Sequence, residues 1–238
     1  MIVSEAHRHR FWWLDLNTFI MEPSYSLQSH IFNDLTANTY RDINHYNPLN
    51  ITHPPSSPYL DPETLSAVGD GKPQSINVIV PQDCGGFNLG SFFVKRSAWT
   101  DRLLDIWWDP VGYEQKHMEW EHKEQDALEY IYTNQPWVRS HLAFINQRKV
   151  NSFPPGACGD NGEDVNIHYK ESDRDFLVNM AGCEWGRDCW GEMYSYRQLS
   201  NNLNRSRWEK LKDAVTGRFK KPEPPTTGNE PQQQQQQQ

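Results

Sequence analysis

The chain has 238 residues, which suits one large domain, the default, or two small ones, and allows a substantial buried core. Its 31 Asp and Glu outnumber its 23 Lys and Arg, and the net charge of −8 excludes the counterion release that drives binding to nucleic acid. No run approaches 18 consecutive apolar residues, so we expect neither a membrane span nor a signal peptide in the chain as given.

Aromatic residues make up 13% of the chain and include ten Trp, while the mean hydropathy is only −0.85. Flat rings of this kind suit stacking on sugars, although Trp residues also pack in cores. A small phosphorylated ligand remains compatible with the negative charge, because a bound divalent metal supplies positive charge locally.

The first predicted elements are a strand that runs into a loop over 11–21 and a helix over 23–35, with Leu27, Ile31 and Leu35 on one stripe. Residues 44–74 hold six prolines and are expected to form a long surface loop or insertion. Since no partner strand precedes residue 11, we expect the N-terminal part of the domain to lie outside this sequence. A fragment of that kind would expose strand edges and be poorly soluble alone.

The next segment combines two strands with a glycine-rich turn. A buried strand over 75–80 meets the turn PQDCGGFNLG, and a second strand follows over 91–96. A helix over 97–109 then has Ser97 as its N-cap and ends before Pro110.

The rest of the chain continues to alternate. The remaining predicted elements are a helix over 119–136, strands over 140–153, 165–169 and 175–182, and a polar amphipathic helix over 193–215. The Pro/Gln-rich tail over 216–238 is expected to be disordered. Alternating strands and helices predict an α/β fold in a single domain over 1–215.

The number of cysteines is even and permits three pairings. They are Cys84, Cys158, Cys183 and Cys189. We favour a bridge within CEWGRDC and an oxidising compartment, since a zinc site lacks a suitably spaced C-x-x-C partner pair. Two glycosylation sequons, at Asn50 and Asn204, agree with a secretory lumen but also arise by chance.

Asp15 and Asn17 follow the aromatic run FWWL and lie two residues apart. In an extended strand both side chains point to one face, so their oxygens can bind one cation together. The alternative is that they cap a turn.

Four blocks of the chain, in this order, resemble glycosyltransferase family 34. They are WWLDLNTFIMEPS, GGFNLGSFFVKRSAWTDRLLDIWWDP, EHKEQDALEYIY and VNMAGCEWGRDCWGEM, and the similarity covers roughly residues 11–200. That family includes fungal Golgi α-1,6-mannosyltransferase subunits, α-1,2-galactosyltransferases and plant xyloglucan xylosyltransferases. The resemblance implies a GT-A fold, Rossmann-like and α/β, here lacking its N-terminal part.

The resemblance also implies a D-x-D motif that binds Mn²⁺ or Mg²⁺ on the donor diphosphate. The motif reads Asp15-Leu16-Asn17 here, and the family's third ligand, a His, is replaced by Asn179. Two of the three expected metal positions therefore carry amides, which implies either a more hydrated site or impaired catalysis. His168 is an alternative ligand, or a hydrogen-bonded structural residue.

The family pattern places Asn88, with Gly86 and Gly90, against the donor sugar or the acceptor, and the alternative is a simple glycine hairpin. It maps Glu124 and Gln125, with Asp126, onto sugar contacts and catalysis. Acidic residues also suit a helix N-terminus without any further function.

In the block GCEWGRDCW, Glu184 stands where the family often has a basic residue. Arg187 is the substitute for holding the diphosphate, or a solvated loop residue. Trp185 and Trp190 either stack on sugars or, as we expect, pack in the core.

Family members retain the anomeric configuration, by double displacement or by front-face attack. No carboxylate stands out as a nucleophile, so we expect front-face attack, with Glu124 or Asp126 stabilising the oxocarbenium-like state. We also expect no trapped glycosyl-enzyme.

The sequence thus predicts a metal-assisted hexosyltransferase of the Golgi lumen, anchored in the membrane as a type II protein by an N-terminal segment outside this chain. The preferred reaction is α-1,6 transfer of mannose from GDP-mannose to a mannan or N-glycan. Alternatives are α-1,2 transfer of galactose from UDP-galactose and a non-catalytic subunit of a mannosyltransferase complex. Other mannosyltransferase subunits are candidate partners.

Overall fold

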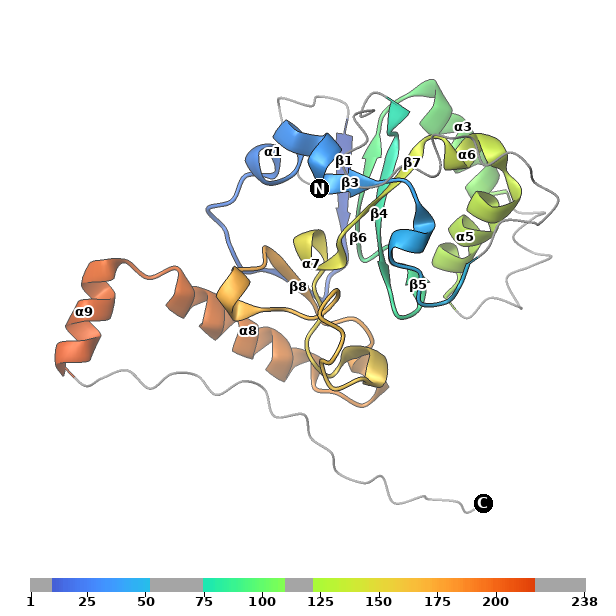
Figure 1. Cartoon of the computed structure of the whole chain (residues 1–238). Coiled ribbons are helices and arrows are strands. Elements are labelled where there is room, and N and C mark those ends of the chain that lie inside the picture. Colours follow the sequence, from blue (N-terminus) through green and yellow to red (C-terminus); the bar gives the residue numbers. More distant parts are fainter. Residues whose placement is uncertain (1–9, 52–74, 110–121, 217–238) are drawn as a thin grey trace, which may run out of the picture.

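The computed structural model describes residues 10–51, 75–109 and 122–216 of the chain. A mixed sheet forms its centre (Figure 1). In spatial order its strands are β1 (Arg10–Leu14), β6 (Ser91–Lys95), β4 (Val78–Asp83), β7 (Leu142–Ile145) and β3 (Thr39–Tyr40), with the short β5 (Gly86–Phe87) paired to β4. Strands β4 and β7 are parallel, and the other pairs are antiparallel. The predicted α/β class is confirmed.

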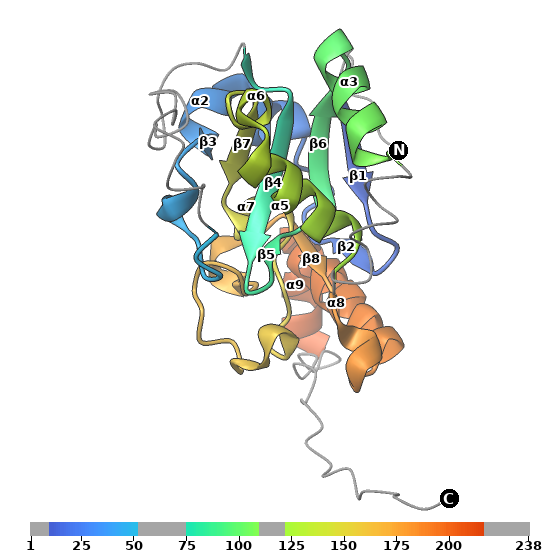
Figure 2. The same ribbon diagram turned by 90° about the vertical axis from the view of Figure 1, so that its right-hand side faces the viewer.

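Helices cover both faces of this sheet (Figures 1 and 2). On one face lie α1 (Leu27–His30), the 3-10 turn η2 (Phe32–Asp34) and α2 (Leu35–Asn38). On the other lie α3 (Ala98–Trp107), α5 (Glu124–Asn134) and α6 (Pro136–Arg139). Along β4 the side chains alternate between the two cores: Val78 and Val80 face α5, while Ile79 faces α1.

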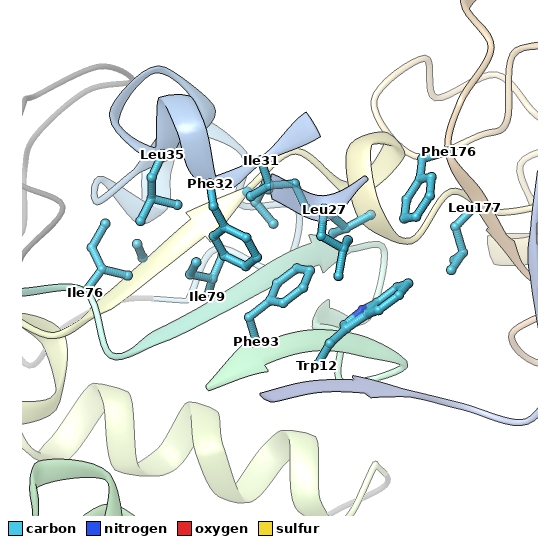
Figure 3. Packing of buried hydrophobic residues seen from close by; sticks show 13 residues of the cluster. Trp12, Leu27, Ile31, Phe32, Leu35, Ile76, Ile79, Phe93, Phe176 and Leu177 are labelled. Carbon is cyan, nitrogen blue, oxygen red and sulfur yellow. The ribbon is translucent and has the colours of Figure 1, made fainter. Parts of the chain in front are cut away.

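Figure 3 shows the core beneath α1 and α2, where side chains of the helices point toward the sheet. Trp12 of β1 stacks on Phe93 of β6 with ring centroids 5.8 Å apart, and Phe32 meets Phe93 edge to face. Each fully buried side chain of this kind stabilises the fold by roughly 1.5–3 kcal/mol. This packing holds β1 in place, and the end of β1 carries the predicted metal motif.

A second, smaller layer lies beside the sheet. Its antiparallel pair is β2 (Thr18–Ile20) with β8 (Leu177–Asn179), and α8 (Cys189–Leu203) packs against it (Figure 2). The remaining elements are α7 (Gln147–Val150), α9 (Arg207–Thr216) and the 3-10 turns η3 (Ile43–His45), η7 (Ala157–Gly159), η8 (Glu171–Asp173) and η9 (Cys183–Trp185). None of these described helices has the length and apolar character needed to cross a membrane.

Several predicted elements agree with the structure. The strands expected at 75–80 and 91–96 are β4 and β6, which pair antiparallel. The predicted cap of α3 is confirmed, since Ser97 Oγ accepts a hydrogen bond from Thr100 N at 3.1 Å. Helix α5 begins at Glu124, inside the range expected for it, and residues 119–121 lie outside the described part.

Three predicted elements are interrupted, because a polar side chain inside each of them ends one element or caps the start of a new helix. The helix over 23–35 is interrupted, and α2 begins where Asp34 caps Ala37 N. The strand over 140–153 ends early because Asn146 caps α7. The last helix is two helices: Asn204 ends α8 by binding Met21 O, and Ser206 caps Glu209 N.

The range 165–169 forms only a bridge, between His168 and Phe153. Most of the predicted loop or insertion over 44–74 lies outside the described residues, as does the predicted disordered tail from 217.

The cysteines form two disulfides. The favoured bridge, Cys183–Cys189, is present, and Cys84 pairs with Cys158 over a sequence separation of 74. The zinc alternative is wrong because all four sulfur atoms are used in these bonds. The long-range bridge joins the β4–β5 turn to η7 beside the site described next.

Strand β1 is one end of the described sheet, so its outer edge has no strand partner among the described residues. Beside it lies an apolar hollow of about 510 Å³, lined among others by Trp13, Phe92 and Leu104. The expected N-terminal part outside this sequence and the poor solubility of the fragment stay predictions.

Candidate active site at Gly90

Predicted site residues from three separate segments meet at Gly90. The backbone N–H of Asp15 donates to Gly90 O at 2.9 Å, which joins the end of β1 to the start of β6. A β-carbon on Gly90 would collide with Asn179 Nδ2 and would lie 2.9 Å from Asn88 Oδ1 and 3.1 Å from Asp15 Oδ2. Only glycine therefore allows Asp15, Asn88 and Asn179 to approach this closely.

Among the described residues, the Asp15 carboxylate accepts one side-chain hydrogen bond, from Trp13 Nε1 to Oδ1 at 3.2 Å. Desolvation by the surrounding chain raises the pKa of the Asp15 carboxyl above its ordinary value, and the hydrogen bond from Trp13 opposes that rise. The negative charge of Glu184 raises this pKa further. Asp15 is an exposed residue, and among the described residues no Lys or Arg forms an ion pair with it.

Asn17 reaches the same region through its backbone. Its carbonyl accepts a hydrogen bond from Met180 N at 3.0 Å, next to Asn179, and Thr18 pairs with Asn179 in the β2–β8 ladder. Of the two positions of the predicted metal motif, Asn17 is thus joined by its backbone to the segment of the third position, Asn179, while Asp15 is joined to Gly90. The side chain of Asn17 itself is half-buried.

The GGFNLG turn is a hairpin as well as part of the site. Gly90 N donates to Asn88 Oδ1 at 2.7 Å, and Asn88 Nδ2 donates to Asp83 Oδ2 at 2.6 Å. Asn88 Oδ1 also accepts from Asn151 Nδ2, and Asn151 Oδ1 accepts from Asn179 Nδ2. Asp83 and Asn151 are site residues that the sequence analysis missed.

Asp83 is a buried carboxyl at the last position of β4. Burial raises its pKa, while hydrogen bonds from Asn88 and Gly85 and the nearby His122 lower it. The sequence signal for Asp83 was an acidic residue at the end of an apolar strand. We missed it because we expected that strand to end at residue 80, three residues earlier. Asn151 had no local signal.

The start of α5 supports the turn from the other side. Gln125 Oε1 accepts from Leu89 N at 3.0 Å, and Glu129, one helical turn later, accepts from Phe87 N at 2.6 Å. Burial raises the pKa of Glu129 to about 7. Gly86, at φ +99°, leaves no room for a β-carbon beside Glu129 Oε1.

The three predicted residues of α5 therefore differ in surroundings. Gln125 holds the glycine turn, and Asp126 Oδ2 accepts from His122 N at 3.0 Å and caps the helix start. Glu124 is exposed and lines a hollow of about 590 Å³ with Trp107 and Trp108. Of the two carboxylates at the start of α5, that of Asp126 accepts this hydrogen bond, and that of Glu124 has no hydrogen bond to a described residue.

The predicted phosphate contact, Arg187, is engaged inside the protein. Its guanidinium donates to Met180 O and Ala181 O and pairs with Glu192 at 2.9 Å. These bonds tie the segment after Asn179 to α8. A role of Arg187 in binding the diphosphate stays a prediction. For that role the guanidinium would have to give up some of these internal bonds.

Nearby, the structure decides one alternative and corrects one expectation. His168 is the hydrogen-bonded structural residue and not a metal ligand, because both ring nitrogens are bonded, to Pro154 O at 3.0 Å and Asp160 Oδ1 at 2.7 Å. Trp185 and Trp190 were expected in the core, but they are 86% and 81% exposed, at the end of η9 and in the first turn of α8.

Residues 7–190 of this chain match a family model described as the galactosyl transferase GMA12/MNN10 family. The chain therefore belongs to that family, which is glycosyltransferase family 34, and membership carries the GT-A fold that the resemblance implied.

Named relatives fit this assignment. The chain is 53% identical over 195 residues to the probable alpha-1,6-mannosyltransferase MNN10 of Saccharomyces cerevisiae, covering 82% of this chain and 47% of that protein. It is 46% identical over 208 residues to an uncharacterized alpha-1,2-galactosyltransferase of Schizosaccharomyces pombe, covering 86% and 56%. The chain thus spans about half the length of the curated relatives it matches.

One solved structure also aligns, a glycosyltransferase involved in the glycosylation of the major capsid of PBCV-1. Its TM-score is 0.41 at 11% identity, over 84% of this chain and 68% of that one. At this level of likeness we draw nothing from it.

Proposed function

We propose that this chain carries the metal and acceptor side of the active site of a retaining hexosyltransferase, which moves a hexose from a nucleotide sugar to a glycan. The observation that supports this most directly is the convergence of Asp15, Asn88 and Asn179 at Gly90. Together they offer one carboxylate and two amides in a place that only a glycine leaves open.

The residues fit a hard divalent cation such as Mn²⁺ or Mg²⁺. Such ions prefer oxygen ligands. The candidates are the Asp15 carboxylate and the side-chain oxygens of Asn17 and Asn179, and Asn179 Oδ1 has no hydrogen-bond partner among the described residues. When bound, the ion would neutralise the charge of the leaving diphosphate. With a single carboxylate in the set, we expect weaker binding than at a site with two.

The chain's own residues have separate tasks in this proposal. Gln125 and Asn88 hold the glycine turn in one shape, so that backbone close to Gly90 can approach the donor sugar. Glu124, facing the hollow beside Trp107 and Trp108, would bind acceptor hydroxyls and stabilise positive charge on the sugar. The leaving phosphate of the substrate takes the acceptor proton in front-face attack, so no described carboxylate is needed as a nucleophile.

For the donor we propose mannose from GDP-mannose, transferred in α-1,6 linkage to a mannan or N-glycan in the Golgi lumen. The identity to MNN10 supports this choice. The 46% identity to an alpha-1,2-galactosyltransferase supports UDP-galactose as the second candidate. Two disulfides fit an oxidising lumen, and a complex with other mannosyltransferase subunits is part of the same proposal.

A non-catalytic subunit is the alternative from another class. It is favoured by the amides at Asn17 and Asn179 and by the internal bonds of Arg187, which leave the site with little charge for a diphosphate and its metal.

The test is transfer by the purified full-length protein from GDP-mannose and from UDP-galactose, with and without Mn²⁺. Wild type, Asn17→Asp and the control Asn201→Asp, on the exposed side of α8, are compared. Mannosyl transfer by wild type that requires Mn²⁺ supports the proposal. If only Asn17→Asp gains metal-dependent turnover, the non-catalytic subunit is the correct interpretation.

A further inference from the structure

The chain holds two N-glycosylation sequons, which begin at Asn50 and at Asn204 and read Asn-Ile-Thr and Asn-Arg-Ser. An N-linked glycan is attached to the side-chain nitrogen Nδ2 of the asparagine and replaces one of the two hydrogens of that amide. A folded protein can carry the glycan without loss of structure only where this nitrogen is not needed for internal hydrogen bonds. The two sequons differ in this respect.

At Asn204 the amide is part of the fold. Its Nδ2 donates to Met21 O at 2.8 Å and to Ser200 O at 2.9 Å, and its Oδ1 accepts from Arg174 Nη2 at 3.1 Å. These bonds end α8 and connect it to the segment after β2. A glycan on Asn204 Nδ2 would replace a hydrogen that binds Met21 or Ser200, at a cost to the stability of the fold.

The hydroxyl residue of this second sequon is also used. Ser206 Oγ donates to Glu209 Oε2 at 2.8 Å and accepts from Glu209 N at 3.2 Å, and Ser206 N donates to Glu209 Oε2 at 2.9 Å. This reciprocal arrangement is the capping box at the start of α9. Both polar side chains of the second sequon are therefore committed to the ends of helices.

At Asn50 the amide is available. Asn50 is exposed, and its side chain makes no hydrogen bond to a described residue. The turn is closed by Asn47 instead, whose Oδ1 accepts from Ile51 N and whose Nδ2 donates to Ile51 O, both at 2.9 Å. Asn50 N donates to Asn47 O at 3.0 Å. The turn therefore keeps all of these bonds when Asn50 Nδ2 carries a substituent.

The backbone at Asn50 explains the residue type only in part. Its φ of +51° lies in the left-handed region, which asparagine tolerates better than most residues. This conformation accounts for an asparagine at position 50, but it does not require the threonine two residues later. The neighbouring Leu49 is 51% exposed, and its Cδ1 lies 3.2 Å from the position of a β-carbon on Gly86. A glycan on Asn50 would thus extend from the surface beside β5.

We propose that Asn50 carries an N-linked oligosaccharide and that Asn204 does not. The inference rests on the lumenal location in the proposed function and not on transfer activity. In the attachment step, Asn50 Nδ2 forms a bond to the anomeric carbon of an oligosaccharide carried on a lipid pyrophosphate. The bond from that carbon to the pyrophosphate oxygen breaks, the lipid pyrophosphate leaves with the electron pair, and the amide loses one proton to a base of the oligosaccharyltransferase that catalyses the step.

The experiment is mass spectrometry of the full-length protein purified from a eukaryotic secretory host. Peptide N-glycosidase in heavy-oxygen water converts each glycosylated asparagine to a labelled aspartate, and the same treatment without the enzyme is the blank. We expect the label at position 50 in most molecules and none at Asn204, which is the matched control within the chain. Thr52→Ala should abolish the label at Asn50 and Thr52→Ser should keep it, because the sequon requires a hydroxyl residue there.

An unlabelled Asn50 in the wild-type protein overturns the inference. A labelled Asn204, or a label at Asn50 that survives Thr52→Ala, overturns it as well.

The two proposals fail separately in these measurements. Wild type that transfers hexose but carries no glycan at Asn50 overturns the glycosylation alone. A protein that is glycosylated at Asn50 and transfers from neither GDP-mannose nor UDP-galactose supports the glycosylation and contradicts the enzyme.

Discussion

Replacement of Gly90 by alanine tests the central feature of the site. The added methyl group would collide with Asn179 Nδ2 and crowd Asn88 Oδ1 and Asp15 Oδ2 at 2.9 and 3.1 Å. All three neighbours are held by hydrogen bonds, to Asn151, Gly90 N and Trp13, so none can move without losing one.

The expected cost has two parts. Overpacking of a rigid site typically destabilises by about 1–3 kcal/mol, and loss of one buried hydrogen bond adds about 1 kcal/mol. We therefore expect Gly90→Ala to lower the free energy of unfolding by roughly 2–4 kcal/mol. If the protein instead moves Asn179 aside, stability falls less and Mn²⁺ affinity falls about tenfold or more.

Urea unfolding followed by circular dichroism measures the first quantity, and Mn²⁺ titration measures the second. Gly85→Ala is the matched control, in the same turn: its β-carbon would meet nothing closer than Asp83 Oδ1 at 3.3 Å, and we expect a change below about 1 kcal/mol. If Gly90→Ala equals Gly85→Ala in both stability and Mn²⁺ affinity, the close approach at Gly90 is not what assembles the site.

Three further changes probe other features. The pKa of Glu129 is raised to about 7, so the folded state holds a proton that the unfolded state releases near pH 4.5. The free energy of unfolding should therefore fall as the pH rises from about 4.5 to 7, and Glu129→Gln should flatten that fall. Urea unfolding across this pH range measures both. Replacing both Cys84 and Cys158 by alanine should cost about 4 kcal/mol in the same assay, from the entropy of the long loop. Alanine at the exposed Trp185 or Trp190 should leave stability within about 0.5 kcal/mol but raise the acceptor KM several-fold if these rings stack on the glycan.

The disulfide and Trp variants have controls within the chain, and the Glu129 variant has a result that would contradict it. Removing Cys183–Cys189, with its separation of 6, should cost only about 2 kcal/mol, and an equal loss for both bridges would contradict the loop-entropy explanation. A Glu129→Gln protein whose stability varies with pH like wild type would show that this carboxyl titrates normally. Trp208→Ala, on α9 and 74% exposed, should leave the acceptor KM unchanged; a rise there equal to that at Trp185 would refute the stacking role.

The sequence allowed prediction of the features that depend on a few neighbouring residues. The β-branched run Val78, Ile79 and Val80 predicted a buried strand, and Ser97 predicted the start of α3. The six-residue spacing of Cys183 and Cys189 predicted their bridge. Ordered motifs also sufficed for the family. The structure brings Asp15 and Asn179 together at Gly90, and their role as site residues stays a prediction.

Local capping explains where the predicted bounds of helices and strands were wrong. The side chain of Asp34 accepts a hydrogen bond from the backbone N–H three residues later, and that of Asn146 from the N–H two residues later. Each bond begins a helix inside a run whose hydrophobic periodicity looks continuous. Periodicity reports which face is buried and not where the backbone changes direction.

Tertiary structure alone decided which side chains complete the site. Asn88 and Asn151 are 63 residues apart in the chain, and they meet only because β4 pairs in parallel with β7 and in antiparallel with β6. Hydrogen bonds across that distance leave no pattern in the neighbouring residues, since any buried asparagine looks alike until the register of the strands places a partner opposite it. For the same reason the roles of Asp83 and Glu129, and the exposure of Trp185, followed from the folded chain and not from the residues beside them.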